Sequence, residues 1–279
     1  MKKVKLKIPA KINLTLDVFE KSGGFHNINS LVASINVFDE ITLKKRNDRN
    51  VTFKNKGVDF CEKDENNNAV KSAKAVMEKY SLLGADIKIK RGIPIGAGLG
   101  SSSADIAGVL RAMQKLYRTG EVSSIAGALG SDVTYMMQGG YAVLKGKGDE
   151  VEKVNAKTKL YLVLLTEEKG VSAGECYKKF DELNIKTTLS TEKAQTALIK
   201  GDINEIGKNL SNDLYIPAKT LALEIENNLE ELKKYSYAVM TGSGSCTYAV
   251  FGTKKERNAC YKKLKEKYHG RLIKAQTII

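Results

Sequence analysis

The fold of this 279-residue chain can be inferred from one stretch, Pro94-Ile95-Gly96-Ala97-Gly98-Leu99-Gly100-Ser101-Ser102-Ser103-Ala104-Asp105. Apolar residues then recur at spacings of three and four from Ile106 to Tyr117, which predicts a helix with one buried face. Any of the three serines can cap this helix. The N–H groups of its first turn and the helix dipole favour an anion, and glycines let a backbone approach a phosphate closely. The stretch therefore predicts a phosphate-binding loop.

Two better-known phosphate loops do not fit these residues. A P-loop needs Lys-Ser or Lys-Thr after its last glycine, and the dinucleotide fingerprint needs glycine where Ser101 stands. From the residues alone, a glycine-rich turn between a strand at 86–90 and an ordinary helix remains an open alternative.

Composition indicates a folded protein of enzyme size. Hydrophobic residues make up 42% of the chain, and 46 Lys and Arg against 32 Asp and Glu give a net charge of +14. Such a charge is compatible with nucleic acid, a membrane surface or small anionic substrates. The lysines are scattered and lack interleaved aromatic residues, so we expect neither a nucleic-acid nor a membrane partner.

The cysteines indicate a reducing compartment. Cys61, Cys176, Cys246 and Cys260 are far apart and form no Cys-x-x-Cys pair, so neither a zinc site nor a disulfide framework is predicted. The basic amino terminus lacks an apolar h-region, and the longest apolar run is too short for a bilayer. We expect a cytoplasmic protein.

Strand patterns frame the loop. Alternation predicts strands at 4–8 and 12–18 with a break at Pro9, and it places Lys11, Asn13, Thr15 and Asp17 on one face, usually a solvated one. A helix is predicted at 68–80, and a buried strand at 161–166. We place a domain boundary near residue 155, giving domains 1–155 and 156–279. Residues 44–66 are expected to form a hairpin or loop edge.

The glycine-serine stretch resembles the second motif of the GHMP kinase superfamily, and Met240-Thr241-Gly242-Ser243-Gly244-Ser245 resembles its third. The resemblance implies an α+β, two-domain GHMP kinase fold, with an N-terminal α+β domain containing a left-handed βαβ crossover and a C-terminal ferredoxin-like domain. It also implies that residues 94–104 bind the triphosphate of ATP. Read alone, residues 240–245 are equally compatible with a β-hairpin turn.

Other segments resemble one branch of the superfamily, the kinases of 4-diphosphocytidyl-2-C-methyl-D-erythritol in the non-mevalonate isoprenoid pathway. They are Pro9 to Leu16, Gly23 to His26, Gly130 to Val133 and Asn212 to Leu214. The chain departs from the branch in two places: it has Ser101 to Ser103 in the loop, and it lacks the arginine and aspartate that usually precede Phe25.

The resemblance implies a set of site residues. Asp132 would be the general base with Lys11 as its neighbour, Asn68 would lie near the adenine, and Ser103 is a tentative Mg²⁺ ligand. Substrate contacts would come from Asn13, Phe25, His26 and Tyr177. From the residues alone, a helix cap is the favoured role for Asp132 and for Asn68, and a structural role is favoured for His26.

The predicted function is ATP-dependent phosphorylation of the 2-hydroxyl of 4-diphosphocytidyl-2-C-methyl-D-erythritol by a monomer or homodimer. One alternative is a GHMP kinase with another alcohol substrate. An alternative of another class is a noncatalytic basic protein that binds nucleic acid.

Overall fold

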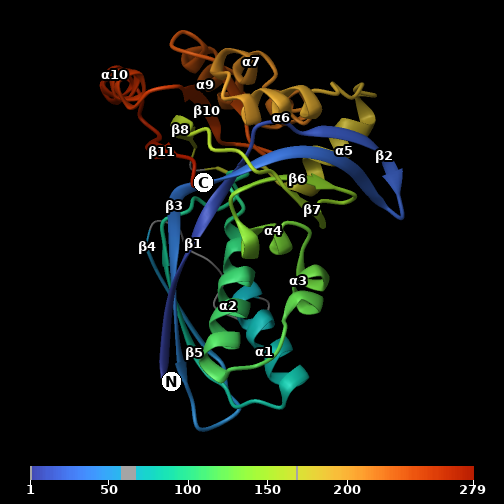
Figure 1. The fold of residues 1–279 in the computed structure, drawn as a ribbon, viewed down its shortest axis with the longest axis vertical. Coiled ribbons are helices and arrows are strands. Elements are labelled where there is room, and N and C mark those ends of the chain that lie inside the picture. Colours follow the sequence, from blue (N-terminus) through green and yellow to red (C-terminus); the bar gives the residue numbers. More distant parts are fainter. Residues whose placement is uncertain (1, 58–66, 168) are drawn as a thin grey trace. The chain divides into compact units, whose positions relative to one another are not determined.

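The computed structural model describes residues 2–57, 67–167 and 169–279. Its elements, in chain order, are β1 (Lys3–Asn13), β2 (Asp17–Ser22), β3 (Phe25–Lys45), β4 (Thr52–Gly57), α1 (Asn68–Tyr80), β5 (Ala85–Arg91), α2 (Ser101–Tyr117), α3 (Ser123–Leu129), α4 (Val133–Gln138), β6 (Tyr141–Lys145), β7 (Glu150–Lys153), β8 (Tyr161–Thr166), α5 (Ala173–Glu182), α6 (Thr191–Lys200), α7 (Ile203–Lys208), α8 (Tyr215–Leu221), α9 (Glu224–Lys233), β9 (Ala238–Met240), β10 (Thr247–Phe251), α10 (Lys254–Lys265) and β11 (Arg271–Gln276) (Figure 1).

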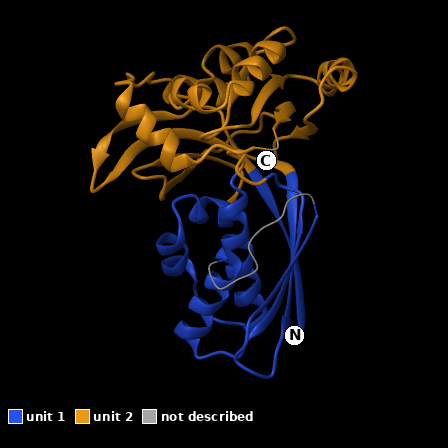
Figure 2. Cartoon of the chain, turned by 180° about the vertical axis from the view of Figure 1, so that it is seen from behind, with its two compact units in different colours: residues 1–10, 37–94, 100–138 blue, residues 11–36, 95–99, 139–279 orange. Residues whose placement is uncertain are grey.

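The chain divides into two compact units (Figure 2). Unit 1 comprises residues 1–10, 37–94 and 100–138, and unit 2 comprises residues 11–36, 95–99 and 139–279. The long strands β1 and β3 contribute residues to both units. The predicted boundary at residue 155 stays a prediction.

Unit 1 packs helices against one face of its strands (Figures 1 and 2). β4 and β5 are parallel and joined through α1, which is the predicted βαβ crossover, and β5 pairs antiparallel with residues 40–45 of β3. Helix α2 lies so close to the strands that a Cβ atom added at Gly108 would come 2.0 Å from the side chain of Ile41 and 2.9 Å from that of Ile8. β4 was not predicted within residues 44–66, and Cys61 lies outside the described residues.

Helix α2 is buried on more than the one face that its pattern predicts. Ala104 to Leu110 are all buried, because α1, α3 and α4 pack around the helix in addition to the strands. Tyr117 is half-buried, and its hydroxyl donates to the carbonyl of Gly84 at 2.7 Å.

Unit 2 contains the predicted ferredoxin-like arrangement. Its strands are antiparallel in the order β11-β8-β10-β9, and their chain order β8, β9, β10, β11 with helices after β8 and after β10 gives the βαββαβ pattern. In the same unit, residues 30–33 of β3 pair with β6, and β6 pairs with β7. Helices α6 and α7 were not predicted from the sequence.

The break predicted at Pro9 is wrong, because β1 runs unbroken from Lys3 to Asn13. Proline lacks an N–H group, and a strand tolerates it where that position does not face a neighbouring strand. β1 has β3 as its neighbour in the sheet.

Two glycine turns of unit 2 lie backbone to backbone. A Cβ at Gly98 would come 2.1 Å from the carbonyl oxygen of Thr241, and one at Gly242 would come 2.9 Å from Cα of Gly98. Both glycines also have positive φ angles, +72° at Gly98 and +57° at Gly242. Any other residue at either position would combine a backbone clash with an unfavourable φ.

We predict that Gly98→Ala lowers the free energy of unfolding by more than about 1 kcal/mol, because the methyl group must displace the Thr241 backbone. Urea unfolding measures this change. The matched control is Gly127→Ala in α3, where a Cβ meets nothing within 4 Å, and its stability should be unchanged or higher. Equal stability of Gly98→Ala and the natural protein would contradict the close approach.

Candidate active site

In unit 1, the start of α2 presents backbone N–H groups without a side-chain cap. Gly100 is the N-cap residue, with a φ of +77°, and no side chain among the described residues accepts a hydrogen bond there. The prediction that a serine caps the helix is therefore wrong. The hydroxyl of Ser101 instead accepts a hydrogen bond from Arg91 Nη1 at 2.9 Å, and that of Ser102 accepts one from Asn68 Nδ2 at 2.6 Å.

Ser103 differs from its two neighbours. Its side chain is half-buried, and its hydroxyl makes no hydrogen bond to any residue that the structure describes. A hydroxyl in this state can accept a ligand contact without losing an internal partner.

Asn68 occupies the first position of α1 and is not its cap. Asn67 caps the helix, since its side chain accepts from the N–H of Ala69. The capping alternative for Asn68 is thus wrong by one residue, and its amide reaches Ser102 on α2 instead. The structure therefore joins two of the predicted nucleotide residues in unit 1.

A buried ion cluster lies beside this helix end. Arg91 Nη1 lies 2.8 Å from Asp39 Oδ2 and 2.8 Å from Asp105 Oδ1, and Arg91 Nη2 lies 2.7 Å from Asp105 Oδ2. The arginine and Asp39 side chains are at most 1% exposed. Burial raises the pKa of Asp105 to about 6 against the lowering effect of Arg91, and burial likewise raises the pKa of Asp39.

Asp132 directly precedes α4 in unit 1. Its carbonyl accepts the N–H of Met136 at 2.9 Å, so its backbone stands in the N-cap position, as the residue pattern alone predicts. The residue is partly exposed. A catalytic role for its carboxylate stays a prediction.

In unit 2, residues 95–99 of the glycine loop are held through their backbone. The N–H of Lys11 donates to the carbonyl of Leu99 at 3.1 Å, and the N–H of Cys246 donates to that of Ala97 at 3.2 Å. The hydroxyl of Thr241 donates to the carbonyl of Gly98 at 3.2 Å. These contacts leave the shape of residues 95–99 determined by neighbours far away in sequence.

The polar face at the end of β1 is buried, which contradicts the expectation that it is solvated. Lys11, Asn13, Thr15 and Asp17 are all at most 5% exposed. Each has partners that offset the cost of burial. Asp17 accepts the N–H groups of Ser190 and Thr191 at the start of α6, and Thr15 and Thr191 share a hydrogen bond of 2.7 Å.

Asn13 is the centre of this polar group. Its Oδ1 accepts from Lys11 Nζ at 2.7 Å and from the N–H of Gly242 at 3.0 Å, and its Nδ2 donates to Ser30 Oγ at 2.8 Å. Its carbonyl accepts the hydroxyl of Tyr248 at 2.7 Å. The structure thus brings together the predicted residues Lys11 and Asn13 with the turn that contacts Gly98.

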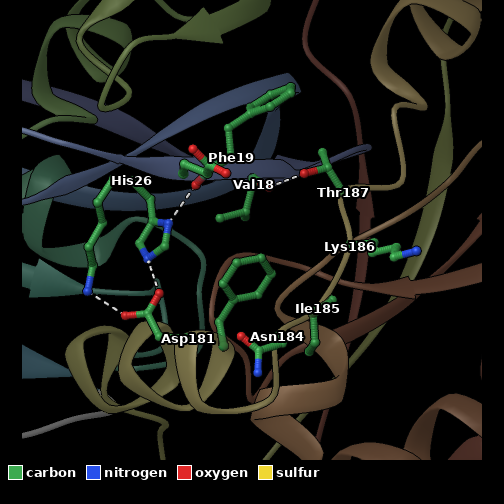
Figure 3. Close-up of a pocket in the computed structure, with 11 residues that line it drawn as sticks. Val18, Phe19, His26, Asp181, Asn184, Ile185, Lys186 and Thr187 are labelled. Atoms are coloured by element: carbon green, nitrogen blue, oxygen red, sulfur yellow. Dashed lines mark hydrogen bonds and ion pairs between the residues drawn. The ribbon is translucent and has the colours of Figure 1, made fainter.

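Both ring nitrogens of His26 lie close to oxygen atoms of unit 2 (Figure 3). Nδ1 lies 2.6 Å from the carbonyl oxygen of Phe19, and Nε2 lies 2.8 Å from Asp181 Oδ1. The ring stacks on Tyr177 at a centroid distance of 5.3 Å and meets Phe180 edge-on. This is the geometry of a structural histidine, the alternative that the sequence left open, and a contact between His26 and substrate stays a prediction.

A cavity of about 640 Å³ opens beside His26 in unit 2. It is lined by β2, the end of α5 and the segment that follows, including Phe19, Asp181 and Lys186 (Figure 3). Of the predicted substrate residues, His26 is among the described residues that line it, and Phe25 and Tyr177 are not. Phe25 is 61% exposed at the end of the β2–β3 turn, with Lys147 Nζ 5.8 Å from the centre of its ring.

Several residues that shape the site were not among the predicted site residues. Arg91 and Asp39 gave no signal, because their partners lie ten or more residues away in the sequence. Thr241 and Asn212 lie in segments that the resemblance did identify, and Asn212 Nδ2 donates to the carbonyls of Met240 and Gly242 at 2.8 and 2.9 Å.

Within residues 2–57, 67–167 and 169–279, no helix has the length and apolar character needed to cross a bilayer. The same ranges contain no group of three His, Cys, Asp or Glu side chains arranged to hold a metal ion.

We predict that Asn13→Ala lowers the free energy of unfolding by about 2–3 kcal/mol, because it leaves the buried ammonium group of Lys11 and the partly buried N–H of Gly242 without this acceptor. Asn13→Asp should lower the free energy of unfolding by less, since the aspartate keeps an acceptor for Lys11 and for the N–H of Gly242. Urea unfolding compares the two with the exposed control Asn227→Ala, which should be near neutral. If Asn13→Ala matches the control, the polar group does not stabilise unit 2.

Comparisons with known proteins agree with this geometry. The chain matches the family described as "GHMP kinases N terminal domain" over residues 67–142 and the one described as "GHMP kinases C terminal" over residues 194–270. A 4-diphosphocytidyl-2-C-methyl-D-erythritol kinase of Caldanaerobacter subterraneus is 34% identical over 95% of this chain and 94% of its own length. Those of Thermoanaerobacter pseudethanolicus and Clostridium beijerinckii are 33% and 32% identical, over 96% and 95% of this chain and 94% and 97% of their own lengths.

Solved structures show the same fold. A crystal structure of 4-(cytidine 5'-diphospho)-2C-methyl-D-erythritol kinase has a TM-score of 0.82 at 24% identity and covers 98% of both chains. The mevalonate kinase of L. major has a TM-score of 0.78 at 17% identity, covering 99% of this chain and 97% of its own. The predicted GHMP kinase fold is confirmed, and the chain belongs to the GHMP kinases, ATP-dependent kinases of small molecules, within the family of the 4-diphosphocytidyl-2-C-methyl-D-erythritol kinases.

Proposed function

We propose that this protein transfers the γ-phosphoryl group of ATP to the 2-hydroxyl of 4-diphosphocytidyl-2-C-methyl-D-erythritol in the non-mevalonate isoprenoid pathway. The observation that carries the proposal is the start of α2, where glycines with positive φ lead into an uncapped helix end. The names of relatives at 32–34% identity support the choice of substrate.

The glycine loop and the first turn of α2 would bind the triphosphate. Phosphoryl transfer needs positioning and charge stabilisation more than covalent chemistry from the protein. Residues 94–104 fit this role because no side chain in the described part of the chain caps the helix end and no carboxylate side chain lies among these residues. Asn68 would lie near the adenine, held by its bond to Ser102.

Mg²⁺ is the metal that we propose for this reaction, and Ser103 is its candidate protein ligand. Mg²⁺ is commonly held by substrate phosphates and waters with one or two protein oxygens, and it neutralises charge on the phosphates when bound. Ser103 fits because its hydroxyl makes no hydrogen bond within the described part of the chain.

Asp132 would orient the acceptor hydroxyl and receive its proton, with Lys11 as its cationic neighbour. A nearby cation can also stabilise the charge that develops as phosphoryl transfer proceeds. Asp132 would position the hydroxyl and take its proton as the bond to phosphorus forms.

Phe25, His26, Tyr177 and Asn13 would form the substrate side of the site. An exposed ring such as that of Phe25 offers a face on which a cytosine can stack.

We place the enzyme in the cytoplasm, since its three described cysteines are buried and unpaired. Its state as monomer or homodimer stays a prediction.

The function is tested by ADP release from ATP and Mg²⁺ with a panel of alcohols: the cytidyl diphospho alcohol, mevalonate and homoserine. We expect turnover with the first and loss of activity when EDTA removes Mg²⁺. Turnover with another alcohol alone would favour the second candidate function, a GHMP kinase of different specificity. The altered turn before Phe25 is the observation that favours this candidate.

Asp132→Asn should lower kcat by at least about 10²-fold with little change in ATP affinity, because it removes the acid–base group and keeps the shape. Steady-state kinetics and nucleotide titration measure both quantities. Asp48→Asn, at a surface ion pair of unit 1, is the control and should keep full activity. Retained turnover in Asp132→Asn would remove Asp132 from its role.

Lys11→Ala should lower kcat by a similar factor, and the double variant with Asp132→Asn should lose clearly less than the product of the two, because the residues act on the same step. If the fold-decrease in kcat of the double variant equals the product of the two single decreases, Lys11 and Asp132 act independently. Urea unfolding of Lys11→Ala separates lost stability from lost catalysis, since Lys11 also donates to Asn13.

A further inference from the structure

The buried ion cluster of unit 1 touches both ends of the glycine loop. On the entry side, Asp39 Oδ1 accepts the N–H groups of Gly92 and Ile93 at 2.7 and 2.9 Å, immediately before Pro94. On the exit side, Arg91 donates to Ser101 Oγ and to both oxygens of Asp105, the first and fifth residues of α2. Arg91 and Asp39 are joined directly at 2.8 Å.

From this geometry we propose that Arg91, together with Asp39 and Asp105, is a positioning device that fixes the ends of the glycine loop for nucleotide binding. The inference rests on the proposed function, in which residues 94–104 hold the triphosphate. None of the three side chains needs to touch ATP. They act through the backbone of Gly92 and Ile93 and through the first turn of α2.

The physical reason is preorganisation. A loop whose ends are fixed has fewer conformations to lose when a ligand orders it, so less of the binding free energy is spent on ordering. Charge-assisted hydrogen bonds in a buried setting hold their geometry better than neutral ones. Arginine suits the position because its planar fork meets Asp105 with two nitrogens while Nη1 also reaches Asp39 and Ser101.

The burial of the cluster needs a function because it is costly. Two carboxylates and one guanidinium, each at most 8% exposed, carry unequal charge into the interior. Apolar residues of similar size would fill this space at no such cost. A role in fixing the loop explains why polar groups stand there.

The test uses Arg91→Lys, which keeps the charge and loses the fork, and Asp105→Asn, which keeps the shape and loses the charge. We expect KM for ATP to rise about tenfold in both, with kcat changed less and KM for the alcohol unchanged. Hydrogen exchange of the protein without nucleotide should be faster at the amides of Gly92 and Ile93. A variant that merely lost folded enzyme would show lower kcat at unchanged KM.

The matched control is Arg46→Lys in the same unit. Arg46 also holds two carboxylates, with Nε 2.7 Å from Asp48 and Nη1 2.7 Å from Asp86, but it lies near the opposite end of β5 and is half-exposed. It should leave KM for ATP and the exchange of Gly92 and Ile93 unchanged. Ser101→Ala removes a single contact of the cluster and should give a smaller rise in KM.

Two results separate this inference from the proposed function. If nucleotide slows exchange in the first turn of α2 while Arg91→Lys and Asp105→Asn leave KM for ATP unchanged, the positioning role is overturned and the kinase site stands. If the variants loosen Gly92 and Ile93 but nucleotide protects no part of α2, the cluster fixes the loop and the proposed nucleotide site is wrong.

Discussion

The close approach of two backbones at Gly98 and Gly242 is the constraint on which the glycine loop of unit 2 depends. No residue with a Cβ fits at either position, because the added carbon would lie within 3 Å of the other turn. Asn13 and Asn212 then satisfy the polar groups of the 240–242 segment from two sides. Gly242 of the third motif is thus explained by packing against the second motif, independently of any ligand.

The sequence predicted most of the elements because their patterns are local. The helix of residues 68–80 and the strand of 161–166 follow from spacing, and the structure confirms them. The alternative of a β-hairpin turn at residues 240–245 is also confirmed, because β9 and β10 pair antiparallel on either side of it. The family resemblance added what local patterns lack, namely the ferredoxin-like strand order. Strand β4 escaped because its sequence, Thr52 to Gly57, carries little alternation and is half-exposed.

The surroundings of the polar side chains could not be predicted from the sequence. Lys11, Asn13, Thr15 and Asp17 alternate with apolar residues, and that pattern is the same whether the polar face meets water or other polar groups. Their partners, such as Ser30, Thr191 and Gly242, come from other elements. The Arg91 cluster is a similar case, since only the fold brings Asp39 and Asp105 to one guanidinium. In both cases, hydrogen bonds to residues distant in the sequence determine the surroundings of the polar side chains.

A cation, Lys21, lies in β2 close to the altered turn before Phe25, although the usual arginine is absent. Lys21 forms an ion pair with Asp181, and the same carboxylate lies 2.8 Å from His26 Nε2. The hydrogen bond from Lys21 and the nearby His26 lower the pKa of Asp181, so the carboxylate stays ionised through the neutral range. Because Lys21 pairs with His26 across the hairpin and Ser22 with Phe25, this anchor on α5 fixes the strand that presents the Phe25 ring. Gly23 and Gly24 therefore need not hold the ring themselves, and the substitutions in the turn are compatible with the substrate of the family.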